Sequence, residues 1–114
     1  MELVDLFPTL ADLCDVEAPD DLQGRSLVPM LIAPETAGKE AVYTVVNRGK
    51  GLGKAVRTEH WRYSKWSDGE ELYDLKNDID EHHNLARSPE HSTTLKVMRR
   101  HLAKMETKAK AAAR

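Results

Sequence analysis

Apolar residues recur along the chain with two different periods, which predict helices near both ends and strands between them. Residues 5–14 carry three leucines at spacings of four and three: Leu6, Leu10 and Leu13. This spacing places them on one face of a short helix. Pro8 falls in the first turn, where its missing amide hydrogen has no intrahelical partner to lose. Asp5 stands where it can cap the helix.

The next stretch reads as a connecting region. Residues 15–24 are rich in Asp and Pro and predict a surface loop, and residues 26–32 carry the apolar spacing of a second helical turn. A Pro- and Gly-containing break follows at residues 34–39. We therefore predict two parts, a connecting region over residues 1–38 and a main module over residues 39–114.

The main module begins with runs that favour strands. Residues 41–47 (AVYTVVN) are dense in β-branched and aromatic side chains. Residues 48–54 (RGKGLGK) have three glycines at alternate positions and three basic residues, and predict a mobile, positive loop. Three further strands are expected over residues 54–58, 61–66 and 71–75. Short connections favour antiparallel pairing, because a parallel crossover needs about a dozen residues.

An amphipathic helix is predicted at the end of the chain. Four apolar residues step by three, four and three: Leu95, Met98, Leu102 and Met105. Basic residues take the opposite face, and Ser92 or Thr93 could cap the helix. The apolar stripe needs a partner, which a one-sided sheet supplies. The expected fold is therefore α+β, with a small antiparallel sheet packed against a carboxy-terminal helix.

Composition and net charge limit the kinds of partner that the chain can bind. The 114 residues include 40% hydrophobic and 32% charged residues, and no apolar run approaches the roughly 18 residues of a membrane span. Seventeen basic and nineteen acidic residues give a net charge of −2, so no strong field attracts nucleic acid or acidic membranes. We expect neither a membrane nor a nucleic-acid partner. Nucleic-acid binding through the basic face of the last helix is the least favoured interpretation.

Candidate catalytic and ligand-binding motifs fail on their spacing. The glycine-rich run matches neither the Walker nor the dinucleotide pattern, since Arg48 stands where the first Walker glycine belongs and Ala55 where the hydroxyl belongs. His82 and His83 lack the helical spacing of a metal pair, so a solvated loop is favoured. Cys14 lies near the apolar stripe of the first helix and is interpreted as a small core residue. We therefore predict no catalytic residue and no metal ligand in this chain.

Three stretches, in this order, resemble the end of a sulfatase of the arylsulfatase and iduronate-sulfatase family. The first is residues 4–10 (VDLFPTL), and the second is residues 22–31 (LQGRSLVPML). The third runs from residues 55–58 (AVRT) through Trp61, Arg62 and Tyr63 to residues 71–75 (ELYDL) and 84–86 (NLA). The resemblance covers residue 3 to about residue 87.

The resemblance implies a two-part enzyme, with an alkaline-phosphatase-like α/β domain followed by a small sheet and a carboxy-terminal helix. The first short helix would then be left over from the larger domain. Such enzymes hydrolyse sulfate esters with calcium and a formylglycine made in a C/S-x-P-x-R motif. Cys14 does not match, because Val16 and Ala18 take the proline and arginine positions. The implied location is periplasmic, secreted or lysosomal.

The favoured hypothesis is a sulfatase carboxy-terminal fragment, inactive alone, whose partner is the missing amino-terminal sulfatase domain. Within it, Arg48, Lys50 and Lys54 are candidate contacts to a sulfated carbohydrate or other sulfate ester, because their positive charge would attract an anionic sugar. A connecting loop that touches nothing is the equally weighted reading. The alternative class is a non-enzymatic interaction module that binds another chain, or itself, through the exposed first helix or a sheet edge.

Overall fold

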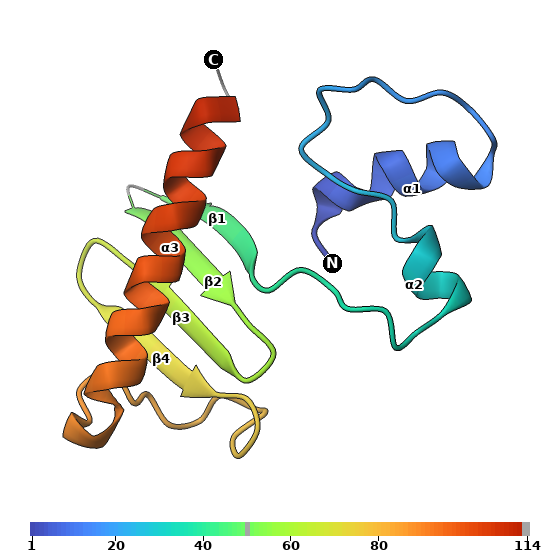
Figure 1. Ribbon diagram of the computed structural model, residues 1–114. Helices are drawn as coiled ribbons and strands as arrows, with labels where there is room; N and C mark the ends of the chain where they lie inside the picture. The colour runs from blue at the N-terminus through green and yellow to red at the C-terminus, as the bar shows by residue number, and fades with distance from the viewer. Residues whose placement is uncertain (50, 113–114) are drawn as a thin grey trace. The chain divides into compact units, whose positions relative to one another are not determined.

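The computed structural model describes residues 1–49 and 51–112 of the chain. They form two compact units, Met1–Lys39 and Glu40–Arg114 (Figure 1). No helix among the described residues is long and apolar enough to cross a membrane.

The amino-terminal unit contains a 3-10 turn η1 (Leu3–Asp5), helix α1 (Leu6–Leu13) and helix α2 (Val28–Ile32). The short helix predicted around Pro8 is confirmed, and Pro8 lies in its first turn. The helix ends where Asp15 adopts a left-handed conformation with φ 53°. The capping prediction for Asp5 is wrong, because Asp5 precedes α1 but its carboxylate makes no capping hydrogen bond to this helix.

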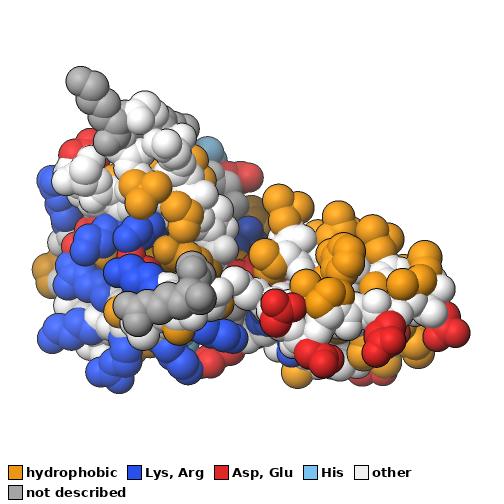
Figure 2. All heavy atoms as spheres, turned by 90° about the horizontal axis from the view of Figure 1, so that it is seen from above, with side chains coloured by type: hydrophobic (Ala, Val, Ile, Leu, Met, Phe, Trp, Pro, Cys, Tyr) orange, Lys and Arg blue, Asp and Glu red, His pale blue; other side chains and the backbone are white. Residues whose placement is uncertain are grey.

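The predicted apolar face of α1 exists, but nothing within the described chain covers most of it. The following large side chains are each at least half exposed: Leu6, Phe7, Leu10 and Leu13. Figure 2 shows hydrophobic side chains gathered over the surface of this unit. Cys14 is exposed as well, so its interpretation as a core residue is wrong.

The carboxy-terminal unit contains a four-stranded antiparallel sheet in the order β1-β2-β3-β4. Its strands are β1 (Val42–Arg48), β2 (Gly51–Arg57), β3 (Trp61–Lys65) and β4 (Glu70–Asp74). Each strand pairs with the next along the chain, which confirms the predicted meander.

The predicted mobile loop over residues 48–54 is wrong. Arg48 is the last residue of β1 and pairs with Gly51, the first residue of β2, so most of this run belongs to a tight hairpin. Gly49 takes a positive φ of 61°, a conformation that glycine adopts readily next to a hairpin turn. Gly53 instead leaves room for an aromatic ring, since an added Cβ would lie 2.3 Å from Trp66 Cζ3. Lys50 lies outside the described residues.

Helix α3 (Ser92–Ala112) packs along one face of the sheet (Figure 1). The core between them consists of Ala41, Val56, Tyr63, Leu72, Leu95, Met98 and Leu102. Three of the four residues of the predicted apolar stripe are thus buried, and Met105 packs against their edge. The 3-10 turn η2 (Pro89–His91) leads directly into α3, so the chain already turns before Ser92 and neither predicted cap is used. The α+β fold with a helix on an antiparallel sheet is confirmed.

Candidate functional site

Two of the three predicted substrate-binding cations, Arg48 and Lys54, belong to the strands β1 and β2. Arg48 ends β1, and Lys50 falls outside the described residues. Lys54 lies in β2 on the side that faces α3, where its ammonium forms an ion pair with Glu106. The hydrogen bond from Lys54 lowers the pKa of the Glu106 carboxyl, and the same bond raises the pKa of Lys54. Lys54 is therefore already neutralised within its own unit.

A second charged cluster joins the β3–β4 hairpin to α3. The Tyr63 hydroxyl donates a hydrogen bond of 2.8 Å to Glu70 Oε2, and Arg99 Nε donates to the same oxygen at 3.0 Å. A second Arg99 nitrogen binds the other carboxylate oxygen, so the pair is bidentate. Tyr63 is only 1% exposed. Burial, together with the hydrogen bond to Glu70, raises the pKa of Tyr63 to about 12, so its hydroxyl stays a donor at neutral pH.

These two clusters border a shallow pocket of 450 Å³ beside α3. Its charged groups include Lys65, Glu70, Arg99 and Glu106. Because Glu70 binds Arg99 and Glu106 binds Lys54, most of the charge is already paired. The two ion pairs hold α3 against the sheet. The side chains that line the pocket do not place a nucleophile beside a base.

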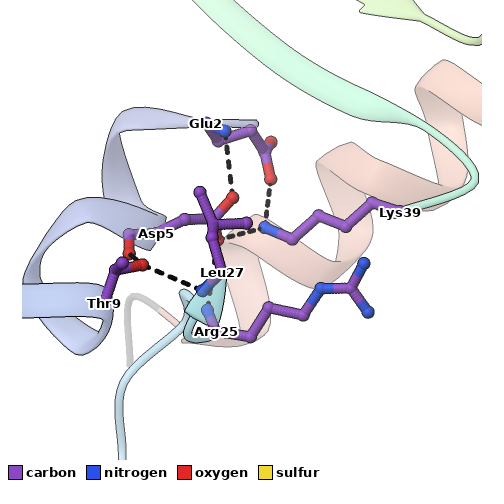
Figure 3. A network of polar contacts seen from close by, with 6 residues as sticks. All are labelled: Glu2, Asp5, Thr9, Arg25, Leu27 and Lys39. Atoms are coloured by element: carbon purple, nitrogen blue, oxygen red, sulfur yellow. Dashed lines mark hydrogen bonds and ion pairs between the residues drawn. The ribbon is translucent and has the colours of Figure 1, made fainter. Parts of the chain in front are cut away.

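In the amino-terminal unit, a buried carboxylate gathers three separate segments (Figure 3). Asp5 is 0% exposed and accepts hydrogen bonds from the backbone amides of Glu2 at 2.9 Å and Arg25 at 3.1 Å. Lys39 Nζ lies 2.6 Å from Asp5 Oδ1 and 2.5 Å from Glu2 Oε2. Burial alone would raise the pKa of the Asp5 carboxyl, but the bonds from Lys39 and the two amides outweigh it and lower that pKa.

Thr9 extends this network by one more link. Its hydroxyl donates to the Asp5 carbonyl at 2.6 Å and accepts from the amide of Leu27 at 2.9 Å. The loop before α2 is thereby tied to η1 through Arg25 and to α1 through Leu27 (Figure 3). Sequence reasoning assigned Asp5 to a cap and gave Thr9 no role. The available signal was their spacing of four, which places both on one side of the chain entering α1.

The acidic stretch around the paired histidines is an exposed loop, as predicted. Asp78 uses its carboxylate to accept backbone hydrogen bonds from His82 at 3.0 Å and His83 at 2.8 Å. Across the described residues, no three His, Cys, Asp or Glu side chains gather so that they could hold a metal ion. The described residues therefore offer no calcium site, and no Cys or Ser of the sequence begins a C/S-x-P-x-R motif, so we derive no chemical step through either group.

The sequence of this chain is similar to those of known sulfatases. The family described as "N-sulphoglucosamine sulphohydrolase, C-terminal" matches residues 1–108. A Δ4,5-hexuronate-2-O-sulfatase of Bacteroides thetaiotaomicron is 35% identical over 111 residues, which cover 90% of this chain and 22% of the relative. Human arylsulfatase K is 33% identical over 75% of this chain and 18% of its own length.

Solved structures agree with the sequence comparison. The crystal structure of a putative sulfatase from Bacteroides thetaiotaomicron superimposes with a TM-score of 0.86 at 33% identity. The match covers 93% of this chain and 24% of that one. The chain thus spans less than a quarter of the length of these relatives. Because the family match covers nearly the whole chain, this protein belongs to the N-sulphoglucosamine sulphohydrolase carboxy-terminal family and is a carboxy-terminal sulfatase domain.

Proposed function

We propose that this chain is the carboxy-terminal part of a sulfatase that hydrolyses sulfate esters of sugars, and that it contributes no catalytic group of its own. The observation that carries the proposal is the family match over residues 1–108 together with the small share, 22%, of the Bacteroides relative that the chain spans. The nucleophile and its metal would then belong to the larger, amino-terminal part. The periplasmic, secreted or lysosomal location implied by the family remains a prediction.

The sugar substrate is supported by what similar proteins are called. One relative is named a Δ4,5-hexuronate-2-O-sulfatase, and a solved neighbour at 33% identity is described as a 2-O GAG sulfatase. Calcium and formylglycine are part of the same proposal for the larger part of the enzyme. In this chain Cys14 is exposed, but it lacks the proline and arginine of the modification motif.

We further propose that the β1–β2 hairpin contributes positive charge toward the sulfated sugar. Because Lys54 is paired with Glu106, the proposal concerns the other two candidates, Arg48 and Lys50. Charge reversal of these two residues in an active full-length sulfatase should raise KM. An unchanged KM would remove the hairpin from substrate binding.

A chimera tests the proposed function. The corresponding carboxy-terminal residues of the Bacteroides hexuronate sulfatase are replaced by this chain, and turnover of a 2-O-sulfated unsaturated disaccharide is measured. We expect the relative truncated before this domain to be inactive and the chimera to recover turnover. A folded, monomeric chimera without turnover would contradict the proposal.

The second candidate function is a non-enzymatic interaction module. The observation that favours it is the exposed apolar face of α1 (Figure 2). Exposed apolar surface of this kind marks a protein–protein contact. The two candidates differ in partner, since a sulfatase fragment covers this face with its own larger part, whereas the module binds another protein or a second copy. Concentration-dependent self-association that persists in the chimera would favour the module.

A further inference from the structure

The sheet of the carboxy-terminal unit has a second face, opposite α3, that carries an open groove. The groove has a volume of 260 Å³ and combines apolar and polar walls. Residues that line it include Val42, Val46, Arg57, Arg62, Ser64 and Trp66. All of them belong to β1, β2 or β3 or directly follow β3, so the groove is built on paired strands.

Two like charges stand side by side in this groove. Arg57 of β2 and Arg62 of β3 are direct cross-strand partners. Arg62 is ion-paired with Glu81, whereas the Arg57 side chain forms no ion pair or hydrogen bond within the described part of the chain. Like charges directly opposite each other destabilise a strand pair. Arg57 is exposed and has no anionic partner among the described residues, so its guanidinium is available to an anion from outside this unit.

An unsatisfied hydroxyl lies at the same place. Ser64 is 1% exposed, and its Oγ has no hydrogen-bond partner among the residues that the structure describes. Ser64 follows Arg62 by two residues on β3, so both side chains project from the same face of the sheet. A buried hydroxyl without a partner is costly and uncommon in native proteins. An oxygen acceptor entering the groove would satisfy Ser64 and Arg57 together.

We propose that this groove is a docking surface for the larger, amino-terminal part of the sulfatase, and that a carboxylate of that part binds Arg57 and Ser64. The inference rests on the proposed function, which supplies the partner. A carboxylate fits because it accepts hydrogen bonds from both a guanidinium and a hydroxyl. Small rotamer changes of the lining side chains, common when partners bind, open the way to Ser64.

The remaining walls favour a protein partner over a free anion. Val42, Val46 and the Trp66 ring supply apolar surface beside the charged end of the groove. An apolar centre with a charged group at its edge is the usual composition of a protein–protein interface. The relatives, moreover, contain over three quarters of their length outside the region that this chain matches.

The first test compares Arg57→Gln in two settings, the 114-residue chain and the same chain extended upstream through a C/S-x-P-x-R motif. In the chain alone, we expect the substitution to leave Tm unchanged or slightly raised, because it removes the repulsion with Arg62. In the extended protein, it should lower Tm by roughly 2–4 °C, because a docked carboxylate loses its partner. The matched control is Arg87→Gln, which removes an exposed arginine without an ion pair among the described residues and should change Tm in neither setting.

Equal destabilisation in both settings would show that Arg57 stabilises its own unit, and no change in either would show that it binds nothing; both results overturn the proposal. A second measurement needs no variant. Hydroxyl-radical labelling of Trp66 should be several-fold slower in the extended wild-type protein than in the chain alone, and equal labelling would overturn the docking surface.

Further measurements identify what binds in the groove and distinguish the docking proposal from the proposed sulfatase function. Protection of Trp66 in the chain alone by a sulfated disaccharide, or by raised protein concentration, would overturn the assignment in favour of a sugar or a second copy. Sulfatase turnover of the extended protein is recorded in the same samples. Turnover with an unprotected groove overturns the docking surface alone, whereas protection without turnover overturns the proposed function alone.

Discussion

At the scale of single residues, the amino-terminal unit depends on one glycine and one carboxylate. A Cβ added to Gly24 would lie 1.8 Å from the carbonyl oxygen of Val4, so the loop and the chain entering α1 touch backbone to backbone. The same loop is held one residue later by the bond from the Arg25 amide to Asp5. Gly24 thus permits the close approach that lets the buried carboxylate bind both segments.

Gly24→Ala should therefore loosen this unit. Backbone atoms cannot rotate away as a side chain can, and overpacking of this kind costs roughly 1–3 kcal/mol. We expect amide hydrogen exchange at Leu27, which donates to Thr9, to become about 5- to 150-fold faster. The matched control is Gly69→Ala, since no heavy atom lies within 4 Å of a Cβ added there. Unchanged exchange at Leu27 in Gly24→Ala would contradict this account of the loop.

At the scale of elements, the contact between α3 and the sheet combines an apolar stripe with the Tyr63–Glu70–Arg99 cluster. The stripe excludes water from the sheet, and the cluster fixes α3 against the β3–β4 hairpin. Because burial and Glu70 raise the pKa of Tyr63 to about 12, the folded chain holds this proton more tightly than the unfolded chain, in which the pKa is near 10. The stabilising contribution is complete below pH 10 and is lost as pH rises through about 12.

The substitution Tyr63→Phe tests whether the protonated Tyr63 hydroxyl stabilises the fold and loses this effect as pH rises. At pH 8 it should lower the free energy of unfolding by about 1.5–3 kcal/mol, because a buried hydrogen bond to a carboxylate is lost. Between pH 9 and pH 12 the variant should lose less stability than the wild type, so the two urea unfolding midpoints converge. The control is Arg100→Gln, which changes an exposed residue of α3 and should keep the wild-type slope. A constant gap between Tyr63→Phe and wild type across this range would contradict the role of the Tyr63 proton.

The elements that could be predicted from the sequence are those in which burial of one side gives the apolar residues a regular spacing. The α3 stripe repeats at helical spacing, and the strands are rich in β-branched and aromatic residues, so both followed from the sequence. The β1–β2 hairpin did not, because glycine favours both loops and close approaches. Gly53 was interpreted as flexible, but it makes room for Trp66, a partner 13 residues away that no local pattern reveals.

The polar clusters were equally hidden from local patterns. Glu70 and Arg99 are 29 residues apart, and Asp5 and Lys39 are 34 apart, so each pair meets only through the fold. The positive charge of Lys54 is evident from the sequence. Its pairing with Glu106 on α3 is not, because it depends on which face of β2 meets the helix. Charge at a position could be predicted from the sequence, but whether that charge is free could not.

At the scale of the whole molecule, the two units have unequal apolar exposure. The carboxy-terminal unit buries a compact core under α3, whereas the amino-terminal unit leaves the apolar face of α1 open. This difference is expected of a segment whose first unit completes its packing with a larger domain. Together with the family match over residues 1–108, it agrees with the proposal that this chain is the carboxy-terminal part of a larger sulfatase.

The most direct test is sulfatase turnover of a chromogenic sulfate ester by this chain alone and by the version extended upstream through a C/S-x-P-x-R motif. We expect turnover in the extended protein and none in the chain alone, because the described residues gather no set of metal ligands and the sequence has no C/S-x-P-x-R motif. Turnover by the 114-residue chain alone would contradict the central claim that the chemistry lies elsewhere.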